Sequence, residues 1–313
     1  MEIKRIEKPK IEFYKRRTFS EKVTATFDFV RENWRTVFKY VTYFVLPLCL
    51  LQAVNDSFMG GYVEGIVNTM GGETDLPPGL GMMGAGYAGI IFCTLVGDVL
   101  VSGLTATLMM LYNERADRLQ AIEYADLKPR VWRNVGRMAV VMLVSVLFSV
   151  AAIGVIILLT MLSPYSLIVT LPAGIALLIP FTLVSPVYAY ERVGIWQAVA
   201  KGYRLGFASW WGVLGFIILL SIIVNIITSV AGIPFYILMM VKMVLGMDGN
   251  APASPLLTIG NYLSSAFLFY FSYIAMALMF IGLSYLYSHM AEKVDGVTVD
   301  RGIEEFETLN TES

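Results

Sequence analysis

The sequence predicts an all-α integral membrane protein with six transmembrane helices. Hydrophobic residues make up 57% of the chain and charged residues only 15%, so much of its surface must face lipid instead of water. Six apolar runs are long enough to cross a hydrocarbon core, which takes about 20 residues of helix. These runs are unbroken, whereas the strands of an outer-membrane barrel are short and alternate in hydropathy. A water-soluble domain and a membrane barrel are therefore both excluded.

Each apolar run is expected to form one helix, and the six helices follow one another as three hairpins in a single membrane domain. The chain divides into a cytoplasmic arm, three hairpins with the polar segments that precede the second and third, and an acidic tail that is expected to be mobile: 1–36, 37–112, 113–190, 191–289 and 290–313. The six runs are 37–58, 84–112, 138–162, 167–190, 211–233 and 261–288.

Basic residues gather on one side of the predicted membrane. Residues 1–39 hold 11 of the 23 lysines and arginines, and 115–137 hold six more, whereas the connections on the opposite side carry only Lys242. Because basic segments are retained in the cytoplasm, both termini are expected there, in a multi-pass protein of the cytoplasmic (inner) membrane. The first 36 residues are polar, so no cleavable signal segment is expected. Nucleic-acid binding has no support in the charge pattern.

The polar stretch between the fourth and fifth runs predicts an amphipathic helix that lies on the cytoplasmic membrane surface. On a helix its aromatic residues fall at spacings of three and four, and its cations take the opposite face. Aromatic rings suit the headgroup level, and the cations can meet anionic lipid there. The candidates for lipid contact in this segment are Trp196, Lys201, Arg204, Trp210 and Trp211.

Similar amphipathic segments precede the other two hairpins, which indicates an internal repeat. The three junctions read "NWRTVFKY" from Asn33, "VWRNVGRM" from Val131 and "SWWGVLGF" from Ser209, and each has a tryptophan followed three residues later by a valine. We therefore expect three related hairpins, each preceded by an interfacial helix. The corresponding lipid-contact candidates are Trp34, Arg35, Trp132 and Arg133.

The segment from Glu191 to Trp211 carries a further pattern. Glu191 closes the fourth run, "AVAKG" from Ala198 to Gly202 fits A-x-x-[KR]-[SG], and two tryptophans open the fifth run. This pattern resembles the six-span membrane domain that some bacteria fuse to a glycerophosphodiester phosphodiesterase, and its stand-alone relatives, many of which carry serine where Gly202 stands. The resemblance implies the six-span fold and places the phosphodiesterase activity in a separate domain.

The sequence offers no catalytic constellation, metal site or cofactor motif. His289 is the single histidine, so sites that need several imidazoles and histidine-based triads are excluded. Cys49 and Cys93 are expected at different depths, unbridged. Gly89, Cys93 and Gly97 recur at four-residue intervals and predict a small-residue face that another helix can approach closely.

Asp98 is the sharpest polar feature, because it lies 14 residues from both ends of the run 84–112 and so at the centre of the bilayer. Counting to the same depth in other runs gives a predicted polar layer whose further members are Asn225, Gln52, and Ser272 or Tyr273. Two interpretations remain open. The layer lines a pathway for a proton, a cation or a small polar solute, or else a protonated Asp98 hydrogen-bonds a neighbour and fixes helix packing.

Two smaller features complete the predicted site. Three prolines, Pro172, Pro180 and Pro186, predict a kink in the fourth run. Glu191, at the cytoplasmic end of that run, is expected to act as a structural clamp by pairing with Arg192, with Lys201 or with a base from another repeat.

The sequence favours a non-enzymatic, lipid-interacting, scaffolding or accessory membrane component, and the alternative is a channel or transporter that uses the layer around Asp98. The expected partners are membrane lipids with anionic headgroups at the cytoplasmic face, and a membrane-protein partner or a second copy of the chain is also compatible.

Overall fold

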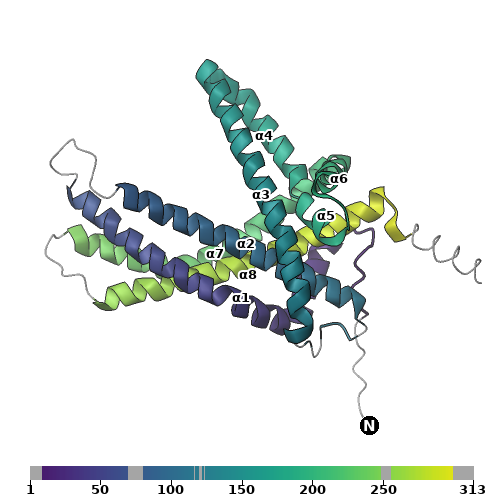
Figure 1. Ribbon diagram of the computed structural model, residues 1–313, viewed down its shortest axis with the longest axis horizontal. Helices are drawn as coiled ribbons and strands as arrows, with labels where there is room; N and C mark the ends of the chain where they lie inside the picture. The colour runs from purple at the N-terminus through teal and green to yellow at the C-terminus, as the bar shows by residue number, and fades with distance from the viewer. Residues whose placement is uncertain are drawn as a thin grey trace, which may run out of the picture. The chain divides into compact units, whose positions relative to one another are not determined.

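The computed structural model describes residues 9–69, 80–115, 117–119, 122, 124–247 and 255–298. Within this part of the chain every regular element is helical, which confirms the predicted all-α class (Figure 1). The elements are α1 (Phe19–Thr69), α2 (Leu80–Glu114), α3 (Tyr124–Leu162), the short 3₁₀ helix η1 (Pro164–Ser166), α4 (Leu167–Phe181), α5 (Val184–Tyr190), α6 (Ile195–Ala208), α7 (Trp210–Met247) and α8 (Pro255–Val294). The end of the acidic tail, 299–313, lies outside the described residues, as do 70–79 and 248–254.

Six stretches of the described helices are long and apolar enough to cross a membrane. The chain is therefore a multi-pass membrane protein, as predicted. Helix α3 is an example, because Leu143, Leu147 and Leu158 are all more than half exposed, as apolar side chains of a helix in lipid are. The six stretches are Phe19–Asp56, Gly84–Glu114, Tyr124–Leu162, Pro164–Tyr190, Trp210–Lys242 and Pro255–Val294.

Several helices are longer than the apolar runs that predict them. The first amphipathic segment and the first run form one continuous helix, α1, of 51 residues. Thr18 and Glu21 begin it with a reciprocal capping box, since each backbone N–H donates to the side chain of the other residue. Helix α7 continues through Pro234 to Met247, so the predicted end at 233 is wrong. A proline and thirteen mostly apolar residues can extend a membrane helix where its neighbours or water satisfy the freed carbonyl.

The predicted kink in the fourth run is confirmed as a break between α4 and α5. Pro186 has no N–H to donate to the carbonyl of Thr182, which removes one bond of the helical ladder. The chain instead closes two tighter turns there, with the Thr182 N–H donating to the Ile179 carbonyl at 3.3 Å and the Leu183 N–H to the Pro180 carbonyl at 3.1 Å.

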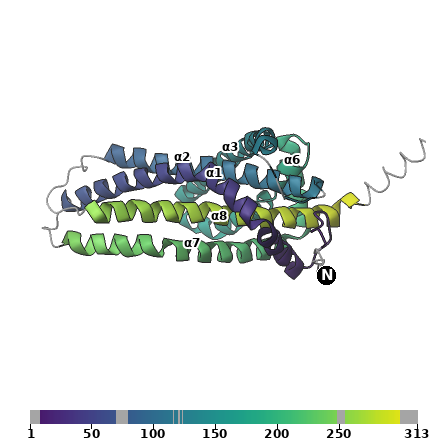
Figure 2. The same cartoon turned by 90° about the horizontal axis from the view of Figure 1, so that it is seen from below.

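The helices divide into two compact units. Unit 2 comprises 38–104 and 221–279, and its segments of α1, α2, α7 and α8 run side by side (Figures 1 and 2). Its core includes one stripe of α1, with Val41, Val45 and Cys49 fully buried at four-residue intervals. Both cysteines, Cys49 and Cys93, are free and buried.

Unit 1 comprises 1–37, 105–220 and 280–313, and α3–α6 lie entirely within it. Helix α3 packs against α4 and α5, and α6 packs against the same two helices. Glycines allow the close approach of α6, since a Cβ on Gly206 would lie 2.6 Å from Pro180 Cα and one on Gly202 would lie 3.2 Å from the Val184 nitrogen. The two contacts fall on either side of the break between α4 and α5.

Replacing Gly206 by alanine should push α6 away from α4. Because the new methyl group would meet backbone instead of a flexible side chain, we expect a loss of about 1–3 kcal/mol in the free energy of unfolding. The matched control is Gly136→Ala on α3, where no atom lies within 4 Å of the new Cβ and higher helix propensity should stabilise by up to about 1 kcal/mol. Thermal unfolding of the detergent-purified proteins measures both. A Gly206→Ala protein that unfolds no earlier than the wild type would contradict the packing described here.

Candidate functional site

Gln52 of α1 and Tyr273 of α8 form the centre of a buried polar cluster in unit 2. The Tyr273 hydroxyl lies 2.9 Å from Gln52 Oε1 and 3.1 Å from the carbonyl oxygen of Cys93. Gln52 Nε2 in turn donates to Thr94 Oγ1 at 3.0 Å. The cluster therefore joins α1, α2 and α8, and it brings together two members of the predicted polar layer.

The small-residue face of α2 makes this cluster possible. A Cβ on Gly97 would lie 2.1 Å from Tyr273 Cε1, so the tyrosine ring rests directly on the helix backbone. About two helical turns earlier, a Cβ on Gly89 would lie 2.7 Å from Asn55 Nδ2, and this nitrogen donates to the Gly86 carbonyl at 2.8 Å. The predicted close approach along this face is confirmed, with α1 and α8 as the approaching helices.

Asp98 is half-buried on α2, next to Gly97. Its backbone carbonyl accepts a hydrogen bond from Ser102 Oγ at 2.7 Å, but within the described residues its carboxyl group makes none. The packing interpretation needs a hydrogen bond from Asp98 to Asn225 or to a nearby hydroxyl, and this part of the chain does not supply it.

Among the described residues, neither Asn225 nor Ser272 hydrogen-bonds to Asp98. Asn225 is exposed, and its Nδ2 donates to the carbonyl of Ser221 at 2.7 Å. Ser272 Oγ donates to the carbonyl of Leu268 at 2.8 Å. Both side chains bond one turn back along their own helix, as short polar side chains do when no partner faces them. Counting residues gives the depth of a side chain in the membrane but not the face on which it lies.

Helix α6 has two faces of different character. Its buried face consists of small residues and one leucine and packs on α4 and α5. Its outer face carries Trp196, which is 75% exposed, and Phe207, which is 53% exposed. The A-x-x-K-G pattern acquires a structural meaning here, because Ala198 and Gly202 provide the close approach while Lys201 turns to neighbouring carboxylates.

The remaining tryptophans fall into two groups. Trp34 on α1, Trp132 on α3 and Trp211 at the start of α7 are at least half exposed, and the Arg35 guanidinium lies 5.5 Å from the Trp34 ring centroid. Trp210 is different, because its Nε1 donates to a backbone carbonyl of α4 at 3.2 Å. Trp210 therefore holds the start of α7 against α4, whereas the sequence places it in the lipid-facing stripe.

Glu191 directly follows α5 and contacts residues of three other helices of unit 1, α3, α6 and α8. Its Oε1 is 2.7 Å from Lys201 Nζ and accepts a hydrogen bond from the Tyr287 hydroxyl at 2.5 Å. Its backbone carbonyl accepts from Arg137 Nη2 at 2.6 Å. Lys201 is one of the partners that the sequence allows, and Arg137 is a base from another repeat, although it contacts the backbone carbonyl of Glu191 and not the carboxylate. Tyr287 has no signal in the local pattern because it comes from a distant helix.

Lys201 also contacts a second carboxylate just beyond the end of α8. Its Nζ lies 2.8 Å from Asp295 Oδ2, and Asp295 Oδ1 pairs with the more exposed Arg204. Burial opposes the charged form of Lys201, but hydrogen bonds to Asp295 and Glu191 outweigh it and raise its pKa above the ordinary value. Lys201 therefore stays charged and is engaged within the protein.

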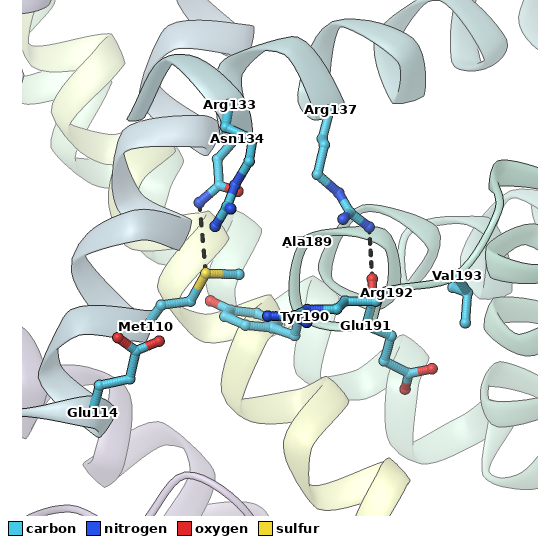
Figure 3. Close-up of a pocket in the computed structure, with 10 residues that line it drawn as sticks. All are labelled: Met110, Glu114, Arg133, Asn134, Arg137, Ala189, Tyr190, Glu191, Arg192 and Val193. Carbon is cyan, nitrogen blue, oxygen red and sulfur yellow. Dashed lines mark hydrogen bonds between the residues drawn. The ribbon is translucent and has the colours of Figure 1, made fainter. Parts of the chain in front are cut away.

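A cavity of about 530 Å³ opens beside Glu191 (Figure 3). Its walls are the end of α2, the first half of α3 and the chain that joins α5 to α6. Arg133, Arg137 and Arg192 line it. Arg137 is held in place, because its Nη2 donates to the carbonyls of Tyr188 and Glu191 and its guanidinium lies 4.4 Å from the Tyr188 ring centroid.

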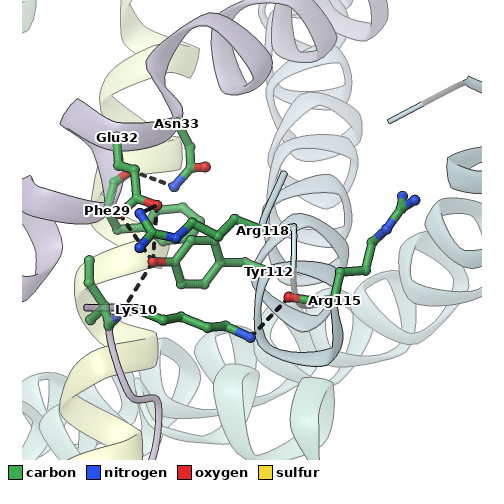
Figure 4. Close-up of polar contacts among 8 residues, drawn as sticks. Lys10, Phe29, Glu32, Asn33, Tyr112, Arg115 and Arg118 are labelled. Atoms are coloured by element: carbon green, nitrogen blue, oxygen red, sulfur yellow. Dashed lines mark hydrogen bonds and ion pairs between the residues drawn. The ribbon is translucent and has the colours of Figure 1, made fainter. Parts of the chain in front are cut away.

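The arm before α1 is tied down in unit 1 by contacts that have no local sequence signal (Figure 4). Lys10 Nζ donates to the carbonyls of Asn113 and Arg115 at 2.7 and 3.1 Å, which satisfies oxygens left free at the end of α2. The Tyr112 hydroxyl donates to Glu32 at 3.1 Å, and Glu32 pairs with Arg118 at 2.6 Å.

Arg17, at the end of this arm, is buried. Burial lowers the pKa of its guanidinium from the ordinary value, and the group donates to the Phe13 carbonyl at 3.0 Å while lying 5.1 Å from the Tyr285 ring centroid. The Arg17 backbone N–H donates to Nδ1 of His289 at 3.0 Å, so this nitrogen carries no proton. The single histidine thus has a structural partner.

Comparison of the chain with models of protein families gives no match, and comparisons with curated proteins and with solved structures give none either. Among the described residues, no three histidine, cysteine, aspartate or glutamate side chains lie close enough together to hold a metal ion. The described part of the chain therefore presents two features with chemical potential for binding, the exposed aromatic rings and the arginine-lined cavity.

A double-mutant cycle on Glu191 and Lys201 should show that this pair is energetically coupled. Because both side chains are mostly buried, we expect a coupling energy of about 0.5–3 kcal/mol from thermal unfolding of Glu191→Gln, Lys201→Met and the double variant. The control cycle uses the exposed pair of Glu12 and Lys15, for which about 0.2–1 kcal/mol is expected. Equal coupling in the two cycles would show that Glu191 does not act as a clamp.

Proposed function

We propose that this protein is a non-enzymatic component of the cytoplasmic membrane that binds lipid at its cytoplasmic face and serves there as a scaffold or accessory subunit. The observation that carries this proposal is the outer face of α6, where Trp196 and Phe207 are more than half exposed on a helix whose other face is packed. Rings presented in this way suit the headgroup region of a bilayer and would be costly in water.

The exposed tryptophans of α1 and α3 support the same function. Trp34 and Trp132 lie in the amphipathic segments that precede the first two hairpins, so the proposal includes three interfacial segments in three related hairpins. The excess of lysine and arginine around these segments supports their cytoplasmic location, because basic segments stay on that side and attract anionic headgroups. The resemblance to the six-span membrane domain found beside glycerophosphodiester phosphodiesterases is part of this proposal.

A variant that retains only Trp196, with the other four tryptophans replaced by phenylalanine, tests lipid contact in nanodiscs. We expect brominated phosphatidylglycerol to quench its fluorescence more strongly than brominated phosphatidylcholine at the same content, because the ring lies at an interface that attracts anionic lipid. The matched control retains only Trp210, which is hydrogen-bonded to α4 and should be quenched less. Equal quenching of the two proteins, or no difference between the lipids, would refute the proposal.

A second candidate function is a channel or transporter for a proton, a cation or a small polar solute. It is favoured by the Asp98 carboxyl group, which lies in a predicted membrane span and has no hydrogen-bond partner among the described residues. Intramembrane acids are costly, and those without a packing partner mark ion or proton pathways.

Asp98→Asn should abolish pH-dependent flux in proteoliposomes if this second function holds, because the amide cannot exchange a proton. Asn225→Ala is the control, since Asn225 is exposed and bonds only within its own helix, and its flux should equal that of the wild type. A wild-type protein with no flux, or an Asp98→Asn protein with unchanged flux, would remove Asp98 from any transport mechanism.

A further inference from the structure

The cavity beside Glu191 contains more positive than negative charge once its ion pairs are taken into account. Two carboxylates line it, but each already has a cation from outside the lining. Glu114 pairs with Arg130, and Glu191 pairs with Lys201 while accepting the Tyr287 hydroxyl. Neither carboxylate is therefore available to neutralise the arginines that line the same space.

The three arginines of this lining have N–H donors that no acceptor in the described part of the chain occupies. Within the described residues, Arg133 and Arg192 form no hydrogen bond or ion pair, and Figure 3 shows the Arg137 guanidinium directed at the backbone carbonyl of Glu191. Arg137 uses Nη2 to bind two backbone carbonyls, but its Nε is buried and has no hydrogen-bond partner in this part of the chain. Positive charges that line one cavity repel one another, and a buried donor without an acceptor is costly, so an anion would relieve both.

We propose that this cavity binds a phosphate group, as a phosphomonoester or phosphodiester, through Arg133, Arg137 and Arg192. The planar donor array of arginine matches the oxygens of phosphate and can bind two of them at once. A volume of about 530 Å³ is in the range of small-molecule sites and has room for a phosphate with an attached polar group. The phosphate belongs either to a lipid headgroup or to a soluble compound.

This site goes beyond the proposed contact of α6 with the membrane surface and uses none of the exposed aromatic rings. Arg137 positions the site, since the backbone carbonyls of Tyr188 and Glu191 fix its guanidinium. Arg133 and Arg192 are exposed at the surface of the chain and can close on the ligand from two different segments, α3 and the α5–α6 connection.

Isothermal titration of the full-length protein in a non-ionic detergent tests the proposal, with inorganic phosphate and short-chain phosphatidylglycerol as separate probes. Replacing Arg133 and Arg192 together by glutamine should weaken binding at least about tenfold, because two charge-assisted contacts are lost. Replacing both by lysine should leave intermediate affinity, since charge remains but paired donation does not. The control removes two exposed cations elsewhere in unit 1, Arg31→Gln with Lys128→Gln, and should bind as the wild type does.

If the wild type binds both probes and the glutamine variant binds neither, the site recognises the phosphate group itself. If the wild type binds only the lipid and the glutamine variant loses that binding, the site recognises a lipid headgroup. No binding of either probe to the wild type, or equal affinity in the arginine and control variants, would overturn the proposal. The titration with inorganic phosphate needs no bilayer, so its result is independent of the tryptophan quenching that tests binding to the membrane surface. Circular dichroism verifies that each variant is folded, and the lysine variant keeps the test valid if the glutamine variant does not fold.

Discussion

Hydrocarbon offers no hydrogen bonds, and this constraint determines the rest of the structure. Every backbone N–H and C=O in the membrane must find a partner within the chain, so the apolar runs become helices. Where the ladder is interrupted, the bonds are replaced locally, as in the two tight turns between α4 and α5. Some buried polar side chains are paired across helices, as Tyr273 is with Gln52, and others bond to carbonyls of their own helix, as Ser264 does. The arginine-lined cavity differs, because the buried Nε of Arg137 has no acceptor among the described residues.

Composition and periodicity predict the helices well because they record which residues of each segment face lipid, water or the protein interior. The all-α class, the apolar stretches, the break near Pro186 and the close approach along the glycine face of α2 all follow from residue type and local spacing. Helix ends are less predictable. The continuation of α7 to Met247 has no local signal, because a proline in a membrane helix marks either an end or a tolerated interruption.

The candidate site is only partly predictable, since depth along a helix does not specify which neighbour a side chain faces. Gln52 and Tyr273 meet, whereas Asn225 at the same counted depth turns to its own backbone. Lys201 looks like a surface cation by periodicity, yet Asp295, ninety-four residues later, draws it into an ion pair. The partners of Lys10 and Arg137 are likewise backbone carbonyls, which leave no trace in a sequence.

Helix α6 bridges the break between α4 and α5 by packing against both helices. Gly206 packs on Pro180, before the break, and Gly202 packs on Val184, after it, so one short helix contacts both halves of the fourth span. A change in the angle between α4 and α5 must therefore move α6 or break its contact with one of them. Because one short helix contacts both halves, its packing limits how far the angle between α4 and α5 can change.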